Sequence, residues 1–331
     1  MIRGGRVAVI GSVNQDVVCE VARLPGPGET VLASASRTNL GGKGSNQAVA
    51  TAKAGGSVQF IGRIGRDPVT ESLRGAMTRA GVKTTGLREV PDVRTGTAYI
   101  AVAAGDNQIV VDPGANFVWE SDAELTAMAE AELLAAADVV VAQFEIPLRV
   151  VTWAAGLAGR FVLNAAPAAQ FDDELLRRCD PLVVNEHELS EISGMPTGSR
   201  EQAGSAAHSM CLRGARSVVA TLGAAGSVWA RRTDGPHEVE VVYQQAPQVV
   251  SVDSTGAGDA YVGALSSALA AGLDLGEAVG FATAAASISV RSTGTHTSYP
   301  THAQVAAVLA EVPPARPIRL PYLIETRFTA I

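Results

Sequence analysis

Several features that mark other classes of protein are scarce in this chain of 331 residues. Aromatic residues make up only 5% of it, and the three cysteines, Cys19, Cys179 and Cys211, are scattered without a CxxC pair. Such an odd, scattered set argues for reduced thiols and against a disulfide framework or a structural zinc site. No apolar run approaches the roughly 20 residues that span a bilayer, so we expect no membrane partner.

An excess of positive charge and a leader segment are also lacking. The formal net charge is −7 and no long basic run occurs, which argues against nucleic acid as a partner. A phosphate ligand is not excluded, because backbone amides and single lysines bind anions within acidic proteins. The first residues run straight into the strand-like segment 7–10 without a secretory signal, so we expect a cytoplasmic protein.

Short apolar runs alternate with helical patterns along most of the chain. Strands are expected at 7–10, 58–61, 139–141, 161–163, 182–184 and 218–221, and helices at 46–54, 69–80, 123–136, 149–157, 173–178, 186–192, 201–213, 257–271 and 277–290. This alternation predicts an α/β, Rossmann-like fold, in which helices cover both faces of a mostly parallel sheet.

Two segments interrupt the alternation and predict a small second β-sheet. Residues 16–37 have an extended pattern, and 97–103 and 109–111 resemble a hairpin that turns at 105–107. A lid built from about 14–40 and 95–112 could cover a ligand and exclude water, although a plain surface hairpin fits the pattern equally well. We expect one domain over 1–312 that includes this discontinuous lid, and a proline-containing tail over 313–331.

The segment 253–259 and the apolar run 260–271 after it suggest an anion site. Gly256, Ala257 and Gly258 leave the backbone amides unobstructed where a helix begins, so the amides and the helix dipole can converge on a phosphate. Asp259 could then take a proton from a hydroxyl that attacks this phosphate. The segment therefore indicates phosphoryl transfer to an alcohol, and a glycine-rich turn capped by aspartate is the alternative.

Groups suited to hydroxyls occur nearer the N-terminus. Residues 41–46 open a helix without the Walker A spacing, and Lys43 and Asn46 could donate to a polyhydroxy ligand that the glycines let approach. Asn14 and Asp16 point the same way on an extended chain and suit a vicinal diol. A tight helix start and an Asx turn explain the two segments without a ligand.

Two more segments follow expected strands at the edge where open α/β sheets bind ligands. Asn185 could donate to a phosphate and Glu188 could hold a water on Mg²⁺, or the two could form an ordinary capping box. The glycines of 221–226 allow close approach by a nucleotide, or form a simple turn. Neither a zinc-protease histidine spacing nor a GxSxG elbow occurs, so hydrolase chemistry lacks support.

Taken in order, these motifs resemble the PfkB-type carbohydrate kinases, and the ribokinase type within them, over roughly residues 7–300. The resemblance is carried by 14–16, 27–30, 41–44 with 46–48, Glu145, 164–167, Asn185 with Glu188, 221–223 and 253–259. It implies that Asp259 is the base and that the amides of 256–258 stabilise developing charge. The implied sugar-binding residues are Asn14, Asp16, Gly42, Lys43, Gly44, Ser45, Asn46, Glu145 and Asp259, and the implied ATP-binding residues are Asn185, Glu188, Thr221, Gly223, Gly226, Gly258 and Thr283.

The same resemblance implies two metal ions and a dimer. Glu188 would order Mg²⁺ and its waters, and a K⁺ activator would be bound by Asp253, Thr255, Ser289, Ser292, Gly294 and Ser298. A homodimer would form through the lid. Two positions depart from the family pattern: Thr70 stands where glycine is usual, and Thr283 stands at the adenine side, where a bulkier polar residue can occur.

The function that the resemblance implies is ATP-dependent phosphorylation of the 5-hydroxyl of D-ribose, giving D-ribose 5-phosphate. The polar set around Asn14, Lys43 and Glu145 suits a sugar, whereas a nucleoside would need an aromatic slot, and Tyr99 and Ile100 of the lid offer no obvious aromatic cage. A kinase of another sugar or of a nucleoside is the nearest alternative. A catalytically silent sugar-binding regulatory protein is the alternative from another class.

Overall fold

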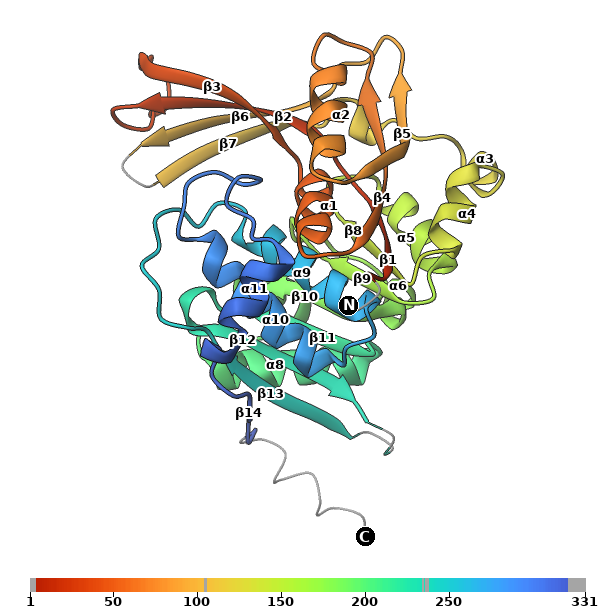
Figure 1. The fold of residues 1–331 in the computed structure, drawn as a ribbon, viewed down its shortest axis with the longest axis vertical. Helices are drawn as coiled ribbons and strands as arrows, with labels where there is room; N and C mark the ends of the chain where they lie inside the picture. Colours follow the sequence, from red (N-terminus) through yellow and green to blue (C-terminus); the bar gives the residue numbers. More distant parts are fainter. Residues whose placement is uncertain (1–3, 104–105, 234, 236–237, 321–331) are drawn as a thin grey trace.

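The structure, a computed structural model, describes residues 4–103, 106–233, 235 and 238–320, and its largest element is a ten-stranded sheet (Figure 1). The order across this sheet is β14-β13-β12-β11-β10-β9-β8-β1-β4-β5. The parallel strands are β1 (Arg6–Ile10), β4 (Ser57–Gly65), β5 (Lys83–Val90), β8 (Val139–Gln143), β9 (Phe161–Asn164), β10 (Cys179–Asn185) and β11 (Ser217–Thr221). All six expected strands are present, and the expected α/β fold is confirmed.

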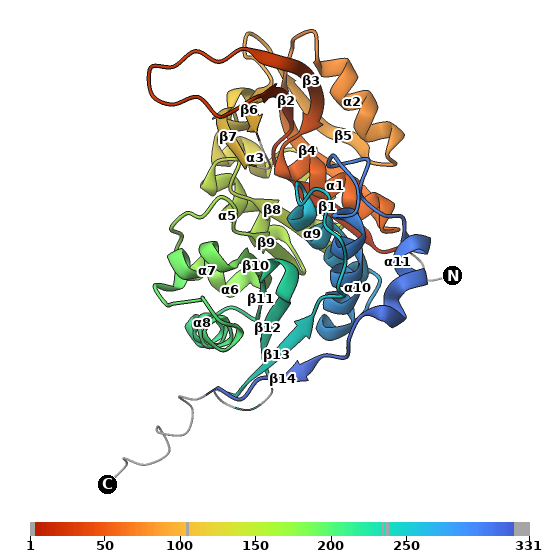
Figure 2. The same ribbon diagram turned by 90° about the vertical axis from the view of Figure 1, so that its left-hand side faces the viewer.

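Helices cover both faces of the sheet (Figure 2). One face packs against α1 (Lys43–Lys53), α2 (Thr70–Arg79), α9 (Ala257–Ala270), α10 (Leu275–Ser289) and α11 (His302–Val308), and the other against α3 (Asp122–Thr126), α4 (Ala129–Ala135), α5 (Leu148–Leu157), α6 (Asp173–Arg178), α7 (Glu186–Ser193) and α8 (Arg200–Arg213). Because side chains alternate along a strand, Val7 and Val9 of β1 enter the first core, whereas Ala8 and Ile10 enter the second.

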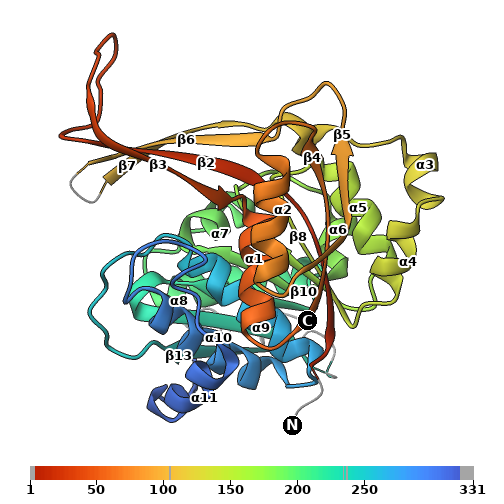
Figure 3. The ribbon, with the colours of Figure 1, turned by 45° about the horizontal axis from the view of Figure 1, so that its top comes forward.

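A second, four-stranded sheet extends sideways from the main body (Figure 3). Its order is β3-β2-β6-β7, built from β2 (Asn14–Val21), β3 (Ala33–Gly41), β6 (Gly96–Ala103) and β7 (Asp106–Asp112). We call it the lid sheet. Asp106 and Asn107, expected in the hairpin turn, instead begin β7 and pair with β6, whereas Gly105 lies outside the described residues.

One helix expectation was wrong, and some elements were not expected. The helix expected at 123–136 is divided into α3 and α4, because Ala127 ends α3 and Met128 has extended backbone angles. The antiparallel strands β12 (Gly226–Arg232) and β13 (Val239–Gln245) were not anticipated. In the tail, β14 (Arg316–Pro317) pairs with β13, and the expectation for 321–331 lies outside the described residues.

Thr70, which departs from the family pattern, is the first residue of α2, directly after the turn that follows β4. Its hydroxyl donates to the carbonyl oxygen of Gly65 at 2.5 Å and to Asp67 at 3.2 Å. Asp67 in turn accepts from the amide of Thr95, just before β6, at 2.7 Å. Thr70 therefore helps to hold the turn between β4 and α2, and Asp67 links that turn to the segment just before the lid strand β6.

No helix within the described part of the chain is both long and apolar enough to cross a bilayer.

Candidate active site

Asp259, in the first turn of α9, is the buried centre of the site. Only 8% of the residue is exposed, and both carboxylate oxygens accept hydrogen bonds from amide side chains of α1. Asn46 Nδ2 donates to Oδ2 at 2.9 Å, and Gln47 Nε2 donates to Oδ1 at 3.0 Å. These two bonds fix the carboxylate, and each oxygen keeps a lone pair for a further donor.

The helices that carry these residues are packed with almost no space between their backbones. A Cβ atom on Gly263 of α9 would lie 2.5 Å from the Cβ of Ala50 and 2.7 Å from the amide nitrogen of Thr51, both on α1. One on Gly44 would lie 2.5 Å from the amide nitrogen of Ser12, which follows β1. The glycines thus allow α1 to approach both α9 and the end of β1.

A second layer of side chains supports Asn46 and Gln47. The oxygen of Asn46 lies 2.7 Å from His296 Nε2, and burial lowers the pKa of His296 to about 4. The imidazole is therefore neutral at pH 7, and its Nε2–H donates to Asn46. Gln47 is held by Gln143 at 2.7 Å and by Asn164 at 2.8 Å.

Lys43 lies among carboxylates. Burial by itself would lower its pKa, but the charges of Asp259, Glu145 and Glu188 outweigh burial and raise it. For Asp259, burial raises the pKa, opposed by the charge of Lys43 and by the bonds from Gln47 and Asn46. Lys43 is thus a permanent cation beside a carboxylate whose basicity burial has increased.

Asp16 and Glu145 are both in this cluster but differ in their contacts. Glu145 accepts from Ser12 Oγ at 2.6 Å and from the amide of Lys43 at 2.9 Å, so it joins the end of β1 to the start of α1. Among the described residues, the carboxylate of Asp16 accepts no hydrogen bond. Burial, followed by the charges of Glu145 and Asp259, raises the pKa of Asp16 to about 7.

The expected anion hole lies at the N-terminus of α9. Gly256 is the N-cap with φ 76°, where a side chain would be strained and would meet the Tyr299 hydroxyl at 2.7 Å. The amide of Ala257 donates to the carbonyl oxygen of Ser254 at 3.1 Å, whereas within the described residues those of Gly256 and Gly258 are not used. Two of the three expected amides are therefore free to bind an anion.

A pocket of about 340 Å³ adjoins these amides. Five of the expected nucleotide-binding residues line it, namely Thr221, Gly223, Gly226, Gly258 and Thr283. Ala257 of the expected anion hole lines it as well. Thr221 ends β11, Gly223 lies in the connection after it and Gly226 begins β12, all at the carboxyl edge of the parallel strands. The structure thus brings together segments that are far apart in the sequence.

Asn185 and Glu188 do not line this pocket. They form the capping box of α7, in which the amide of Asn185 donates to Glu188 Oε2 and the amide of Glu188 donates to Asn185 Oδ1, each at 2.8 Å. Burial raises the pKa of Glu188, and the charges of Lys43 and Asp259 also act on it. Glu188 therefore faces the charged cluster while it caps a helix, so the two interpretations of this pair are compatible.

The expected cation ligands lie on two loops that Asp253 joins. Asp253 Oδ1 accepts from the amide of Thr255 at 2.9 Å, and Oδ2 accepts from the amide of Gly294 at 3.0 Å. In the described part of the chain the carbonyl oxygens of Thr255, Ser292 and Gly294 accept no hydrogen bond. Free carbonyl oxygens beside a carboxylate suit a large, weakly hydrated cation. The hydroxyls of Ser289 and Ser298 donate to backbone carbonyls of their own segments.

Sequence reasoning did not identify the supporting residues Gln47, Gln143, Asn164 and His296. Gln47 and Asn164 lie within motifs that carry the family resemblance, and their place in those motifs is the sequence signal that could have identified them. Gln143 and His296 lie in ordinary strand and loop patterns, and only the folded structure places them next to the site.

Comparisons with known proteins agree with this geometry. The model of the pfkB family carbohydrate kinases matches residues 5–302. Ribokinase of Haemophilus influenzae is 35% identical over 308 residues, which cover 92% of this chain and 98% of the relative. Deoxyribokinase of Salmonella typhi is 33% identical over 301 residues, which cover 89% and 95%.

Among solved structures, Arabidopsis thaliana ribokinase complexed with ribose and ATP superposes with a TM-score of 0.83 at 32% identity, covering 92% of this chain and 99% of that one. Three findings lead to one conclusion: the family model matches nearly the whole chain, relatives above 30% identity match almost its full length, and a solved ribokinase has the same fold. This chain belongs to the PfkB family of carbohydrate kinases.

Proposed function

We propose that this protein transfers the γ-phosphoryl group of ATP to the 5-hydroxyl of D-ribose and produces D-ribose 5-phosphate. The observation that carries the proposal is the placement of Asp259, which is buried, held by Asn46 and Gln47, and next to the free amide of Gly258 at the edge of the 340 Å³ pocket. The similarity to a ribokinase solved with ribose and ATP supports the choice of substrates.

In the proposed reaction, the 5-hydroxyl donates its proton to the carboxylate of Asp259 as its oxygen attacks the γ-phosphorus. The new O–P bond forms while the bond from the γ-phosphorus to the bridging oxygen of ADP breaks. The amides of Gly256 and Gly258 and the positive end of α9 stabilise the charge on the transferred group. Lys43 adds a fixed positive charge to the same cluster.

The sugar is proposed to lie among the polar residues of α1 and β2. Asp16 is available to accept from hydroxyls, because no described group donates to it, while Lys43, Asn46 and Asn14 donate. Glu145 holds the N-terminus of α1 in place through the Lys43 amide and binds the sugar through its remaining lone pairs. Gly42, Gly44 and Ser45 belong to the tight start of α1, with Ser45 N donating to Ser12 O at 2.9 Å.

The side chains and carbonyl oxygens of the candidate site fit Mg²⁺ and K⁺, the two ions that the family resemblance implies. Mg²⁺ would neutralise phosphate charge, and the half-buried carboxylate of Glu188, on which the charge of Lys43 acts, is the group proposed to hold its water shell. K⁺ would be held by the free carbonyl oxygens beside Asp253, where it would fix the loop that leads into the anion hole.

The test of the proposal is an ADP-release assay with D-ribose, 2-deoxy-D-ribose, D-fructose and adenosine, with and without K⁺. We expect the highest kcat/KM with ribose, and ³¹P NMR of the product should show a phosphate on O5. If none of the tested acceptors stimulates ADP release, the kinase proposal is contradicted and the silent sugar-binding protein is favoured.

Deoxyribose kinase activity is the second candidate, because a deoxyribokinase is 33% identical to this chain, close to the 35% of a ribokinase. Sequence identity therefore does not separate the two sugars. A kcat/KM for 2-deoxyribose above that for ribose in the same assay would assign the protein to this second activity.

The pH dependence of kcat/KM for the sugar should show whether Asp16 binds the sugar. The pKa of Asp16 is raised to about 7, so the carboxyl gains a proton as the pH falls through this value and loses an acceptor for a hydroxyl. We expect kcat/KM for the sugar to fall about tenfold per unit below pH 7. In Asp16→Asn the part of this limb that comes from Asp16 should be absent, and the part that comes from Asp259 should remain. A profile identical to that of the wild-type protein would remove Asp16 from sugar binding.

Activation by K⁺ should depend on Asp253. Removing its carboxylate in Asp253→Ala takes away the charged ligand and the link between the loops of Thr255 and Gly294. We expect the ratio of turnover in K⁺ to turnover in tetramethylammonium to fall to about one. A ratio that stays at the value of the unchanged protein would show that the cation binds elsewhere.

The lid sheet is the proposed dimer contact. Tyr99 and Val110 are opposite each other on one face of β6 and β7, and Ile109 and Val111 lie on the other face; all four are between 47% and 69% exposed. Exposed apolar side chains that gather on one element are typical of a protein–protein contact, and a second copy of the chain would cover one of these faces.

A further inference from the structure

Asn116, a residue outside the site motifs, is bonded to the proposed sugar ligand Asn14. It lies in the short helix η1 (Gly114–Phe117), where the chain returns from β7 to the main body, and it is 2% exposed. Its Oδ1 accepts from the amide of Val13 at 2.9 Å, and its Nδ2 donates to Asn14 Oδ1 at 2.7 Å and to the carbonyl oxygen of Val13 at 3.3 Å.

These contacts determine which way the amide of Asn14 faces. A backbone N–H can only donate, so Val13 fixes the oxygen of Asn116 and leaves its Nδ2 towards Asn14. Asn14 must therefore turn its oxygen to Asn116 and its Nδ2 away. That Nδ2 donates to no group in the described part of the chain. Asn14 is only 3% exposed, but its Nδ2 is not among the fully buried polar atoms without a partner, so the atom keeps some exposed surface for a ligand to reach.

We propose that Asn116 is a positioning residue, which orients Asn14 so that Asn14 presents N–H donors to the sugar. The inference rests on the proposed function and deepens it. Beside Asn14, Asp16 has no donor from the described residues and can only accept when ionised. An N–H donor and a carboxylate acceptor on one strand complement two neighbouring hydroxyls, which both donate and accept.

Gly96 supplies the space for this pair of amides. It is opposite Asn14 in the parallel ladder of β2 and β6. A Cβ atom there would lie 2.2 Å from Asn116 Nδ2 and 2.4 Å from Asn14 Oδ1, the two atoms that form the bond. The φ of Gly96 is not in the left-handed region, so its backbone does not require glycine. The lack of a side chain is needed for the contact itself.

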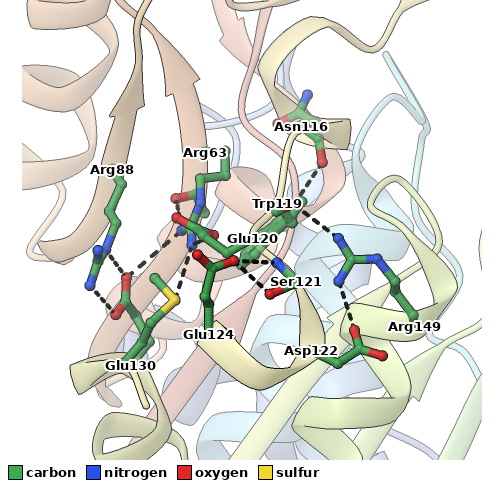
Figure 4. Close-up of polar contacts among 12 residues, drawn as sticks. Arg63, Arg88, Asn116, Trp119, Glu120, Ser121, Asp122, Glu124, Glu130 and Arg149 are labelled. Carbon is green, nitrogen blue, oxygen red and sulfur yellow. Dashed lines mark hydrogen bonds and ion pairs between the residues drawn. The ribbon is translucent and has the colours of Figure 1, made fainter. Parts of the chain in front are cut away.

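A buried stack holds the backbone of Asn116 from behind (Figure 4). Trp119 Nε1 donates to the carbonyl oxygen of Asn116 at 2.8 Å, and the guanidinium of Arg63 lies 4.0 Å from the centre of the indole. Arg63 is 2% exposed and pairs with Glu120 at 2.6 Å and Glu130 at 3.8 Å. Breaking buried ion pairs is costly, so Asn116 is anchored to β4 of the main sheet.

The experiment is a double-mutant cycle on Asn14 and Asn116, with the Kd for D-ribose measured by calorimetry. We expect Asn116→Ala to weaken ribose binding about tenfold, the effect of one lost or misdirected hydrogen bond. If Asn116 acts through Asn14, the double variant should bind ribose no more weakly than Asn14→Ala alone. The Kd for ATP should stay within about twofold in every variant. Losses that multiply in the double variant would overturn the inference.

Gly96→Ala provides a second route that leaves both asparagines in place. We expect it to weaken ribose binding about as much as Asn116→Ala, and to add nothing when Asn14 is already alanine. The control is Gly156→Ala on α5, because a Cβ at Gly156 meets no atom within 4 Å. It should bind ribose normally.

Gly96→Ala decides the question if Asn116→Ala does not fold, and normal ribose binding by Gly96→Ala would overturn the inference. If the wild-type protein binds none of the tested sugars, the proposed function and this inference are both overturned. If the wild-type protein binds ribose but the losses of affinity multiply in the double variant, the inference alone is overturned.

Discussion

Replacing Asp259 by asparagine should lower turnover by a factor on the order of 10² to 10⁴ and leave sugar affinity largely unchanged. The asparagine keeps the size of the side chain but cannot take the proton of the attacking hydroxyl. It also points a new N–H group at Asn46 or Gln47, which now donate to the two carboxylate oxygens. The ADP-release assay gives kcat and calorimetry gives the sugar Kd, so an effect on turnover can be told apart from an effect on sugar affinity.

Asp16→Asn is the matched control for this variant. It removes one carboxylate from the same cluster, yet Asp16 has no bond to Asn46 or Gln47, so it should change the sugar KM far more than kcat. Near-normal turnover in Asp259→Asn would exclude Asp259 as the base. Equal losses of kcat in both variants would show that the reaction depends on the total negative charge of the cluster and not on one proton acceptor.

Six of the seven parallel strands could be predicted from the sequence because each is a short, buried apolar run, whereas β5 was missed because only part of it is buried. The antiparallel part could not be predicted. The glycines of residues 221–226 predict either close approach by a nucleotide or a simple turn, and Thr221, Gly223, Ala224 and Gly226 line the pocket. They also form the tight connection through which β11 leads into β12, and so short a connection must reverse the chain and give antiparallel pairing. One glycine-rich segment serves both purposes.

The residues of the candidate site could be proposed from the sequence because their motifs occur in a characteristic order. Their supports could not, since contacts such as those of Gln143 with Gln47 and of Asn116 with Asn14 join residues about a hundred positions apart. An asparagine or glutamine in a strand or a loop gives no sign of which partner it will meet. The sequence therefore predicts the reacting groups better than the network that orients them.

The contact between α1 and α9 is the place where a single methyl group should damage both stability and catalysis. In Gly263→Ala the new Cβ would overlap Ala50 and Thr51, at 2.5 Å and 2.7 Å. Alanine is favoured over glycine inside a helix by about 1 kcal/mol, but overpacking a close backbone contact costs about 1–3 kcal/mol or more. The helices must therefore move apart, and we expect a lower free energy of unfolding.

Because α1 carries Lys43, Asn46 and Gln47 while α9 carries Asp259, the same movement separates Asp259, the proposed base, from the groups that hold it. A displacement of about 1 Å at a reacting group can cost about 10²-fold in rate, so we expect kcat to fall about 10- to 100-fold in protein that is still folded. The control is Gly280→Ala on the neighbouring helix α10, where a Cβ meets no atom within 4 Å. It should raise the melting temperature slightly and leave kcat unchanged. If Gly263→Ala behaved like Gly280→Ala, close approach of the two helices would not be what places Asp259.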